Sequence, residues 1–78
     1  MNDRERRELE SLRDKDIEAY HHYLEQLQNT AAYMDEKYGI DRQDRWTAAE
    51  RGTFNFLYEE VRRREKRVRE TEERLRRG

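Results

Sequence analysis

Residues 59–77 read EEVRRREKRVRETEERLRR, and every glutamate in this stretch is followed four residues later by an arginine. Four residues are slightly more than one turn of an α-helix, so each pair lies on one side of a helix, with the acid first, the favourable order. The pairs are Glu59/Arg63, Glu60/Arg64, Glu65/Arg69, Glu70/Arg74, Glu72/Arg76 and Glu73/Arg77. Neither a strand nor a loop profits from this spacing, and the chain contains no proline. The stretch therefore predicts a long helix.

The hydrophobic residues before and within this stretch recur at alternating steps of three and four. This spacing is typical of the seam of a coiled coil. One set consists of Ile17, Tyr20, Leu24, Leu27, Ala31, Met34 and Tyr38, and the other of Phe54, Leu57, Val61, Val68 and Leu75. Arg64 and Thr71 occupy the later seam positions of the second set, so we expect the seam to weaken toward the C-terminus.

The first set predicts a helix over about residues 3–38. Asp3 is the expected N-cap, because a short acidic side chain accepts hydrogen bonds from the first free backbone N–H groups. Gly39 should end the helix, because glycine tolerates a left-handed backbone. Ile40 should then fold back toward Met34, as in a Schellman motif.

The connection is predicted over about residues 39–46, with a single turn capped by Asp41. The second helix is predicted over about residues 47–77. Thr47 and Glu50 have the spacing of a capping box, in which each side chain bonds the backbone N–H of the other residue.

A connection of this length makes the two helices antiparallel neighbours. Folding about the hinge pairs positions whose numbers sum to roughly 85. The expected neighbours are Ile17 with Val68, Leu24 with Val61, and Ala31 with Phe54. Residues 1–18 carry a net charge of −2 and residues 59–77 carry +3, so the two ends attract. We predict one all-α domain over residues 1–78, an antiparallel two-helix hairpin with coiled-coil-like packing.

The composition points to self-association. The chain has 78 residues, of which 32% are hydrophobic and 47% are charged, and its net charge is −1. A chain this small buries little surface and usually needs a metal, disulfides or oligomerisation. It has no cysteine and no apolar run of the length of a membrane span. We expect a cytoplasmic protein with no membrane partner, as a homodimer that forms a four-helix bundle.

A second stripe on each helix marks the expected dimer contact. On the second helix the stripe is Ala49, Gly52, Thr53 and Phe56, and on the first it is Ala19, Tyr23, Gln26, Thr30 and Tyr33. A glycine within a helix is costly and is usually kept where another backbone approaches closely. Trp46 either packs over the start of the second helix or anchors an interface. The candidate partner residues are Tyr23, Tyr33, Trp46, Ala49, Gly52, Thr53 and Phe56.

Two other kinds of site are weighed. Glu18, His21, His22 and Glu25 include a Glu-x-x-His spacing that also occurs in di-iron bundles, but their heptad positions face solvent or the bundle edge. The basic segment of the second helix is an alternative nucleic-acid site, although its glutamates neutralise most of the charge. Its candidate residues are Arg62, Arg63, Arg64, Arg67, Arg74, Arg76 and Arg77.

The sequence gives little support for catalysis. It has a single serine, no cysteine and no glycine-rich phosphate loop, and a hairpin has no cleft of its own. We expect a non-enzymatic protein-protein interaction module without a cofactor, such as an adaptor, an assembly factor or an inhibitor. A nucleic-acid-binding dimer is the first alternative, and a metal-binding bundle is the second.

Overall fold

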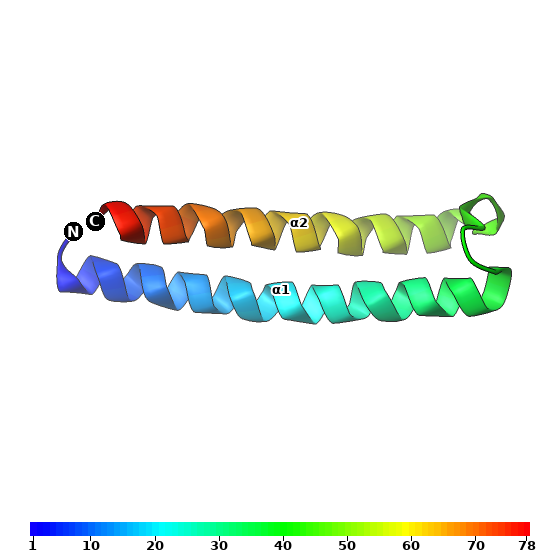
Figure 1. Cartoon of the computed structure of the whole chain (residues 1–78), viewed down its shortest axis with the longest axis horizontal. Coiled ribbons are helices and arrows are strands. Elements are labelled where there is room, and N and C mark those ends of the chain that lie inside the picture. The colour runs from blue at the N-terminus through cyan, green and yellow to red at the C-terminus, as the bar shows by residue number, and fades with distance from the viewer.

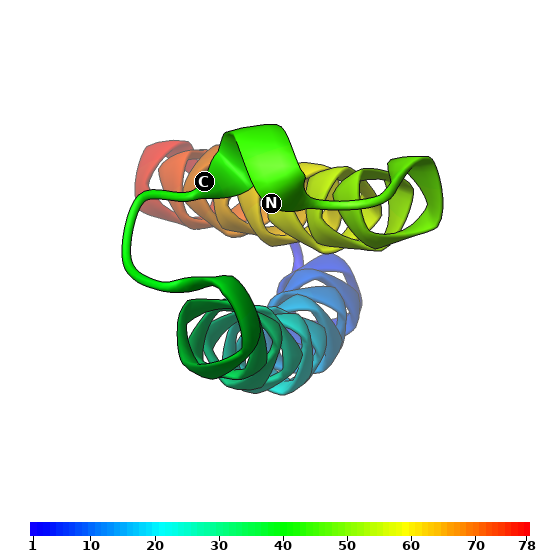
Figure 2. The ribbon, with the colours of Figure 1, turned by 90° about the vertical axis from the view of Figure 1, so that its right-hand side faces the viewer.

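The computed structural model describes all 78 residues and contains two long helices that lie side by side in opposite directions (Figure 1). Helix α1 spans Asp3–Tyr38, the short 3-10 helix η1 spans Gln43–Arg45, and helix α2 spans Ala48–Arg77. The molecule is a rod of 53 × 18 × 15 Å, with both termini at one end and the hinge at the other. Seen end-on in Figure 2, the two helices cross instead of running strictly parallel. The structure confirms the predicted all-α antiparallel hairpin.

The N-terminal caps follow from short polar side chains. Asn2, and not the predicted Asp3, caps α1: its side-chain oxygen accepts a hydrogen bond of 2.8 Å from the backbone N–H of Glu5. Asp3 is the first helical residue instead, where an acidic side chain still favours the positive end of the helix dipole. The capping box of α2 is confirmed. Thr47 Oγ1 accepts from Glu50 N at 3.1 Å, and Glu50 Oε1 accepts from Thr47 N at 2.8 Å.

Gly39 ends α1 as predicted, but not through a Schellman motif. Its backbone has φ 96° and ψ 161°, an extended conformation with positive φ that is almost confined to glycine. Ile40 is 76% exposed, so the prediction that it folds back toward Met34 is wrong. Because Gly39 leaves the helix in an extended direction, the chain turns away from α1 before it reaches η1.

The single turn of the hinge is also placed differently from the prediction. It lies at Gln43–Arg45, and Arg42 occupies its N-cap position without a side-chain hydrogen bond. Asp41 therefore does not cap the turn. It adopts a left-handed backbone with φ 60°, which aspartate tolerates better than most residues.

The hydrophobic seam is present but thin. Only six residues are buried, and the four apolar ones are Leu9, Met34, Leu57 and Val61. Ile17 and Val68 line one groove between the helices, which agrees with their predicted pairing. No side chain is completely enclosed. A two-helix hairpin can cover each seam residue only from one side, so most of the apolar surface keeps some contact with solvent.

Candidate functional site

The hinge half of the hairpin carries a face without charged residues. We call it the uncharged face, and it joins the second stripes of both helices. Its residues are Ala19, Tyr23, Gln26, Thr30 and Tyr33 of α1 and Ala49, Gly52, Thr53 and Phe56 of α2. The rings of Tyr23 and Phe56 meet edge to face with centroids 6.4 Å apart, so the structure brings the two stripes together across the helices. Almost half of the chain is charged, which makes a face of nine uncharged residues distinctive.

This face is open to solvent. Phe56 and Tyr33 are each 56% exposed. A Cβ atom placed on Gly52 would have no atom within 4 Å, so no part of the same chain approaches the glycine. Large aromatic groups therefore stand beside a flat surface made by Ala49 and Gly52.

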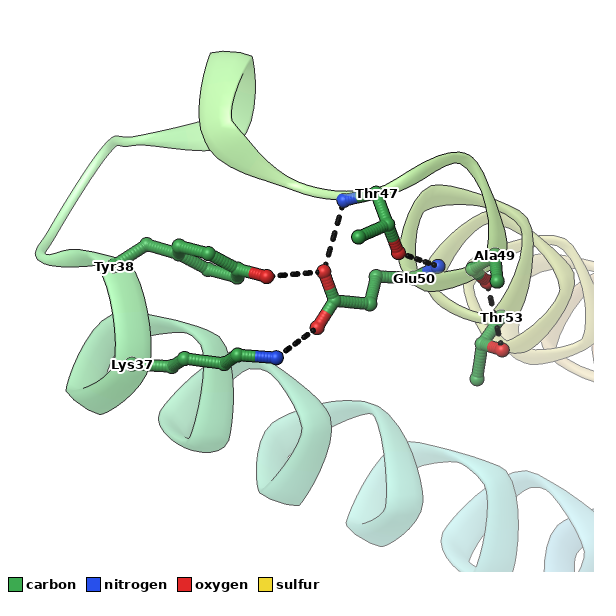
Figure 3. Close-up of polar contacts among 6 residues, drawn as sticks. All are labelled: Lys37, Tyr38, Thr47, Ala49, Glu50 and Thr53. Carbon is green, nitrogen blue, oxygen red and sulfur yellow. Dashed lines mark hydrogen bonds and ion pairs between the residues drawn. The ribbon is translucent and has the colours of Figure 1, made fainter.

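Two polar residues of the uncharged face are satisfied by neighbours on their own helices. Thr53 Oγ1 donates a hydrogen bond of 3.1 Å to the backbone oxygen of Ala49, one turn earlier (Figure 3). The side-chain amide of Gln26 lies 2.9 Å from Nε2 of His22, with the direction of the hydrogen bond set by the histidine tautomer. Each of these bonds lies within one helix and persists when the face is covered, which lowers the cost of removing it from water.

A polar clamp at the hinge holds the ends of the two helices together. Glu50 is its centre: besides the N–H of Thr47, it accepts hydrogen bonds from the Tyr38 hydroxyl at 2.6 Å and from Lys37 Nζ at 3.1 Å (Figure 3). The hydrogen bond from Tyr38, followed by that from the Thr47 backbone, lowers the pKa of Glu50 from 4.5 to about 2. Interactions with the Tyr38 hydroxyl and then with the Glu50 carboxylate raise the pKa of the Lys37 amine above its usual value. The clamp thus joins the end of α1 to the start of α2, and Lys37 also lies 5.7 Å from the centre of the Tyr33 ring, one turn earlier.

Trp46 belongs to a different cluster. Its ring meets Phe54 edge to face at 5.1 Å, Phe54 stacks with Tyr58 at 6.5 Å, and the Arg62 guanidinium lies 5.8 Å from the Tyr58 ring centre. Two residues along a helix turn the chain by about 200°. Phe54 and Phe56 therefore project from opposite sides of α2. The structure places Trp46 in intramolecular packing, apart from Tyr23 and Phe56.

A buried ion network crosses the terminal half of the seam. Asp16, only 4% exposed, lies 2.9 Å from Arg64 Nη1 and 3.6 Å from Arg67 Nε. Glu60, 7% exposed, accepts a bond of 2.8 Å from Arg63. Arg64 occupies a seam position as predicted, and it reaches across the two helices to Asp16. Beyond it, Val68 and Leu75 are only partly buried, whereas Leu57 and Val61 are buried, so the apolar seam does thin toward the C-terminus.

Sequence reasoning did not single out Asp16 or Glu60 as structural residues. A signal for Asp16 was present: it directly precedes a seam residue, Ile17, just as Arg67 directly precedes Val68. In an antiparallel pair such flanking positions face each other across the seam, so an acid and a base there predict an ion pair.

The network changes the interpretation of the arginine-rich segment. Of the seven arginines proposed for nucleic acid, four have acidic partners: Arg63 with Glu60, Arg64 and Arg67 with Asp16, and Arg77 with Glu73. Arg62 lies over Tyr58. Arg74 and Arg76 have no ion-pair partner. The structure does not gather these side chains into one uncompensated positive strip, which phosphate binding requires.

The four residues considered for a metal do not converge. Glu18, His21, His22 and Glu25 are all exposed, and His22 is paired with Gln26. The structure contains no cluster of three or more His, Cys, Asp or Glu side chains placed to hold a metal ion. His21 instead lines an open groove of about 360 Å³ beside Ile17, Tyr20 and Val68.

Neither helix has an apolar stretch long enough to cross a bilayer. Comparison with protein-family models, with curated proteins and with solved structures gave no match to this chain. The interpretation of its function therefore depends on the geometry of the hairpin.

Proposed function

We propose that this chain is a small, non-enzymatic protein-protein interaction module that works as an adaptor, an assembly factor or an inhibitor. The observation that carries the proposal is the uncharged face. A helix with apolar residues on a second side is typically covered by a partner on that side as well. Exposed aromatic residues beside a flat surface are the usual anchors of protein interfaces.

The mechanism is the presentation of a preorganised surface. The capping box and the Glu50 clamp hold the helix ends at the hinge, so the ring pair of Tyr23 and Phe56 is positioned before binding. Binding then costs less conformational entropy than the ordering of a flexible segment would. The charged residues of the remaining surface contribute orientation and association rate more than affinity.

The nucleic-acid alternative ranks lower because four of its seven arginines form ion pairs with acidic side chains of the same chain. The metal-binding alternative ranks lowest because its four candidate ligands are exposed and do not form a cluster that could hold a metal ion.

Photocrosslinking tests the proposal. Phe56 is replaced by a photoreactive phenylalanine analogue, and the matched control carries the same analogue at Tyr58, an exposed aromatic position on the opposite side of α2. We expect the Phe56 position to give a discrete crosslinked protein product in cells, and the Tyr58 position to give much less of it. Absence of any product from Phe56, or equal products from both positions, would contradict the proposal.

A further inference from the structure

We infer that a second copy of this chain covers the uncharged face, related to the first by a two-fold axis next to Gly52, so that two hairpins form a four-helix bundle. This inference rests on the proposed function, because it names the partner of the same face. Three properties of the hairpin support it: the area that it leaves exposed, the shape of the face and the satisfaction of its polar groups.

The single hairpin exposes more surface than a folded monomer of its mass normally does. Its accessible area is 6257 Å². The usual scaling gives about 5,200 Å² for a monomer of 9.8 kDa. The excess of about 1,000 Å² is close to the ~800 Å² that each partner buries in an interface of standard size.

The radius of gyration leads to the same conclusion. It is 16.8 Å, whereas a compact domain of 78 residues has about 11.5 Å. A second rod laid alongside the first would widen the short dimensions of 18 and 15 Å without extending the long one. Side-by-side association is therefore the arrangement that makes this chain compact.

The shape of the face fits a copy of itself. In a two-fold interface each surface patch meets the same patch of its partner, so any projection must find a recess on that patch. On the uncharged face the Phe56 ring is 56% exposed, and the small residues Ala49 and Gly52 leave open space on the same stripe, since a Cβ on Gly52 would meet no atom within 4 Å. A two-fold axis between Gly52 and Thr53 brings Phe56 of each copy over Ala49 of the other. The exposed ring and the small residue that it would cover thus lie seven positions apart on one stripe, as a self-complementary contact requires.

Polar groups and charge do not oppose the contact. The Thr53 hydroxyl donates to the backbone of its own helix and the Gln26 amide bonds His22, so these two hydrogen bonds persist when the face is covered. The nine residues of the face carry no charge, so two copies bring no like charges together near Gly52. A positive charge lies at the edge of the face, where Lys37 Nζ is 5.7 Å from the centre of the Tyr33 ring. Each chain has a net charge of only −1, so long-range repulsion between copies is small.

Sedimentation equilibrium of the full chain across the micromolar range tests the inference. Wild type should sediment with twice the mass of one chain. Gly52→Leu places a branched side chain at the axis, where the second copy must approach, and should weaken association at least tenfold. Leucine is a good helix former, so far-UV circular dichroism of this variant should remain helical. The control is Lys66→Leu, which adds leucine at an exposed position of α2 outside the uncharged face and should leave the dimer intact.

The outcomes separate this inference from the proposed function. A monomeric wild type would overturn the inference, and so would a dimer that Gly52→Leu leaves unchanged. If wild type is monomeric but the Phe56 position crosslinks to a protein of another mass, the interaction module stands and the second copy is excluded. If wild type is monomeric and the Phe56 position yields no crosslink, both proposals fail.

Discussion

Asp16 is a buried carboxylate in a hairpin that buries only six residues. Burial of a charge is tolerated when ion pairs and hydrogen bonds replace the lost water. Asp16 has two arginines around it, and Arg64 in turn depends on Asp16 for its one short hydrogen bond. The buried Nε of Arg64 has no hydrogen-bond partner, since Glu60 is 4.0 Å away. The two residues are therefore energetically coupled across the seam.

Replacement of Asp16 by alanine should lower the free energy of unfolding by about 1–3 kcal/mol, because Arg64, which is partly buried, loses its one short hydrogen bond and keeps only Glu60 at 4.0 Å. Arg67 is half exposed and can turn to solvent, so the loss should stay below that of a fully buried pair. Urea denaturation followed by circular dichroism measures the change. Asp14→Ala removes an exposed carboxylate that lies 3.4 Å from Arg13, and should change the stability by less than about 0.5 kcal/mol. Equal losses in the two variants would contradict this account.

Among individual residues, the burial of the seam residues was easier to predict from the sequence than the burial of the charged ones. Leu57, Val61 and Met34 are buried where the alternating spacing places them. Asp16 and Glu60 escaped prediction because a charged residue beside a seam is exposed in most helices. The ion pairs of Asp16 come from arginines of α2, so they depend on how the two helices are placed relative to each other. Glu60 pairs within its own helix, with Arg63 and Arg64.

Among the elements, the hinge joins α1 and α2 through one carboxylate. Glu50 closes the capping box within α2 and also receives Tyr38 and Lys37 from α1. The capping box was predictable, because it depends on residues three apart in the sequence. The bonds from Tyr38 and Lys37 of α1 were not predictable, because they depend on the direction that the chain takes after Gly39.

The clamp predicts a dependence of stability on acid. The pKa of Glu50 is lowered from 4.5 to about 2, so folding favours the ionised carboxylate. Its stabilisation is fully present above pH 4.5 and is lost as the pH falls from 4.5 toward 2. Glu50→Gln should therefore be less stable than wild type at neutral pH, and this difference should shrink on acidification through that window. Denaturant unfolding at several pH values measures the difference.

Tyr38→Phe provides the control for this prediction. It removes the hydrogen bond that lowers the pKa of Glu50 the most, so the carboxyl should titrate closer to 4.5, as followed by NMR. If the difference in unfolding free energy between wild type and Glu50→Gln stays constant from neutral pH to below 4.5, ionisation of Glu50 in the clamp is not the cause of that difference.

The glutamate–arginine spacing in α2 predicted the helix correctly, but only part of the ion pairing. Of the six expected pairs, Glu60–Arg64, Glu65–Arg69 and Glu73–Arg77 form. Arg63 pairs with Glu60 instead of Glu59, and Glu70 pairs with Lys66. Exposed pairs of this kind are worth little individually, so competing partners three or four residues away exchange at small cost.

For the whole molecule, the hinge length and the seam spacing together predicted the antiparallel hairpin and the side-by-side placement of Ile17 and Val68. The cross-helix contacts depart from a constant sum of 85, slightly near the hinge, where the numbers sum to 87, and more toward the termini, where they sum to 80. Lys37 meets Glu50, whereas Asp16 meets Arg64 nearer the termini. The helices cross in Figure 2, so a single sum cannot hold along the full rod. The uncharged face was visible as a spacing, but its openness required the structure.

The distribution of charge over the whole rod predicts weak binding to nucleic acid. We expect no measurable affinity for duplex DNA or RNA at about 0.15 M salt, because each ion pair within the chain withholds an arginine from phosphate. Fluorescence anisotropy over a series of salt concentrations tests this expectation. Tight binding with a steep salt dependence, weakened in a variant that replaces both Arg74 and Arg76 with glutamine, would restore the nucleic-acid alternative.

Both ends of the chain lie at the tip farthest from the hinge, where Met1 rests against Gly78 (Figure 1). Because the helices are connected only at residues 39–47, a small rotation of one helix about this hinge would move its free end by a large distance. A pair of fluorescent dyes on the two ends would sense the opening of the arms long before the helices themselves melt.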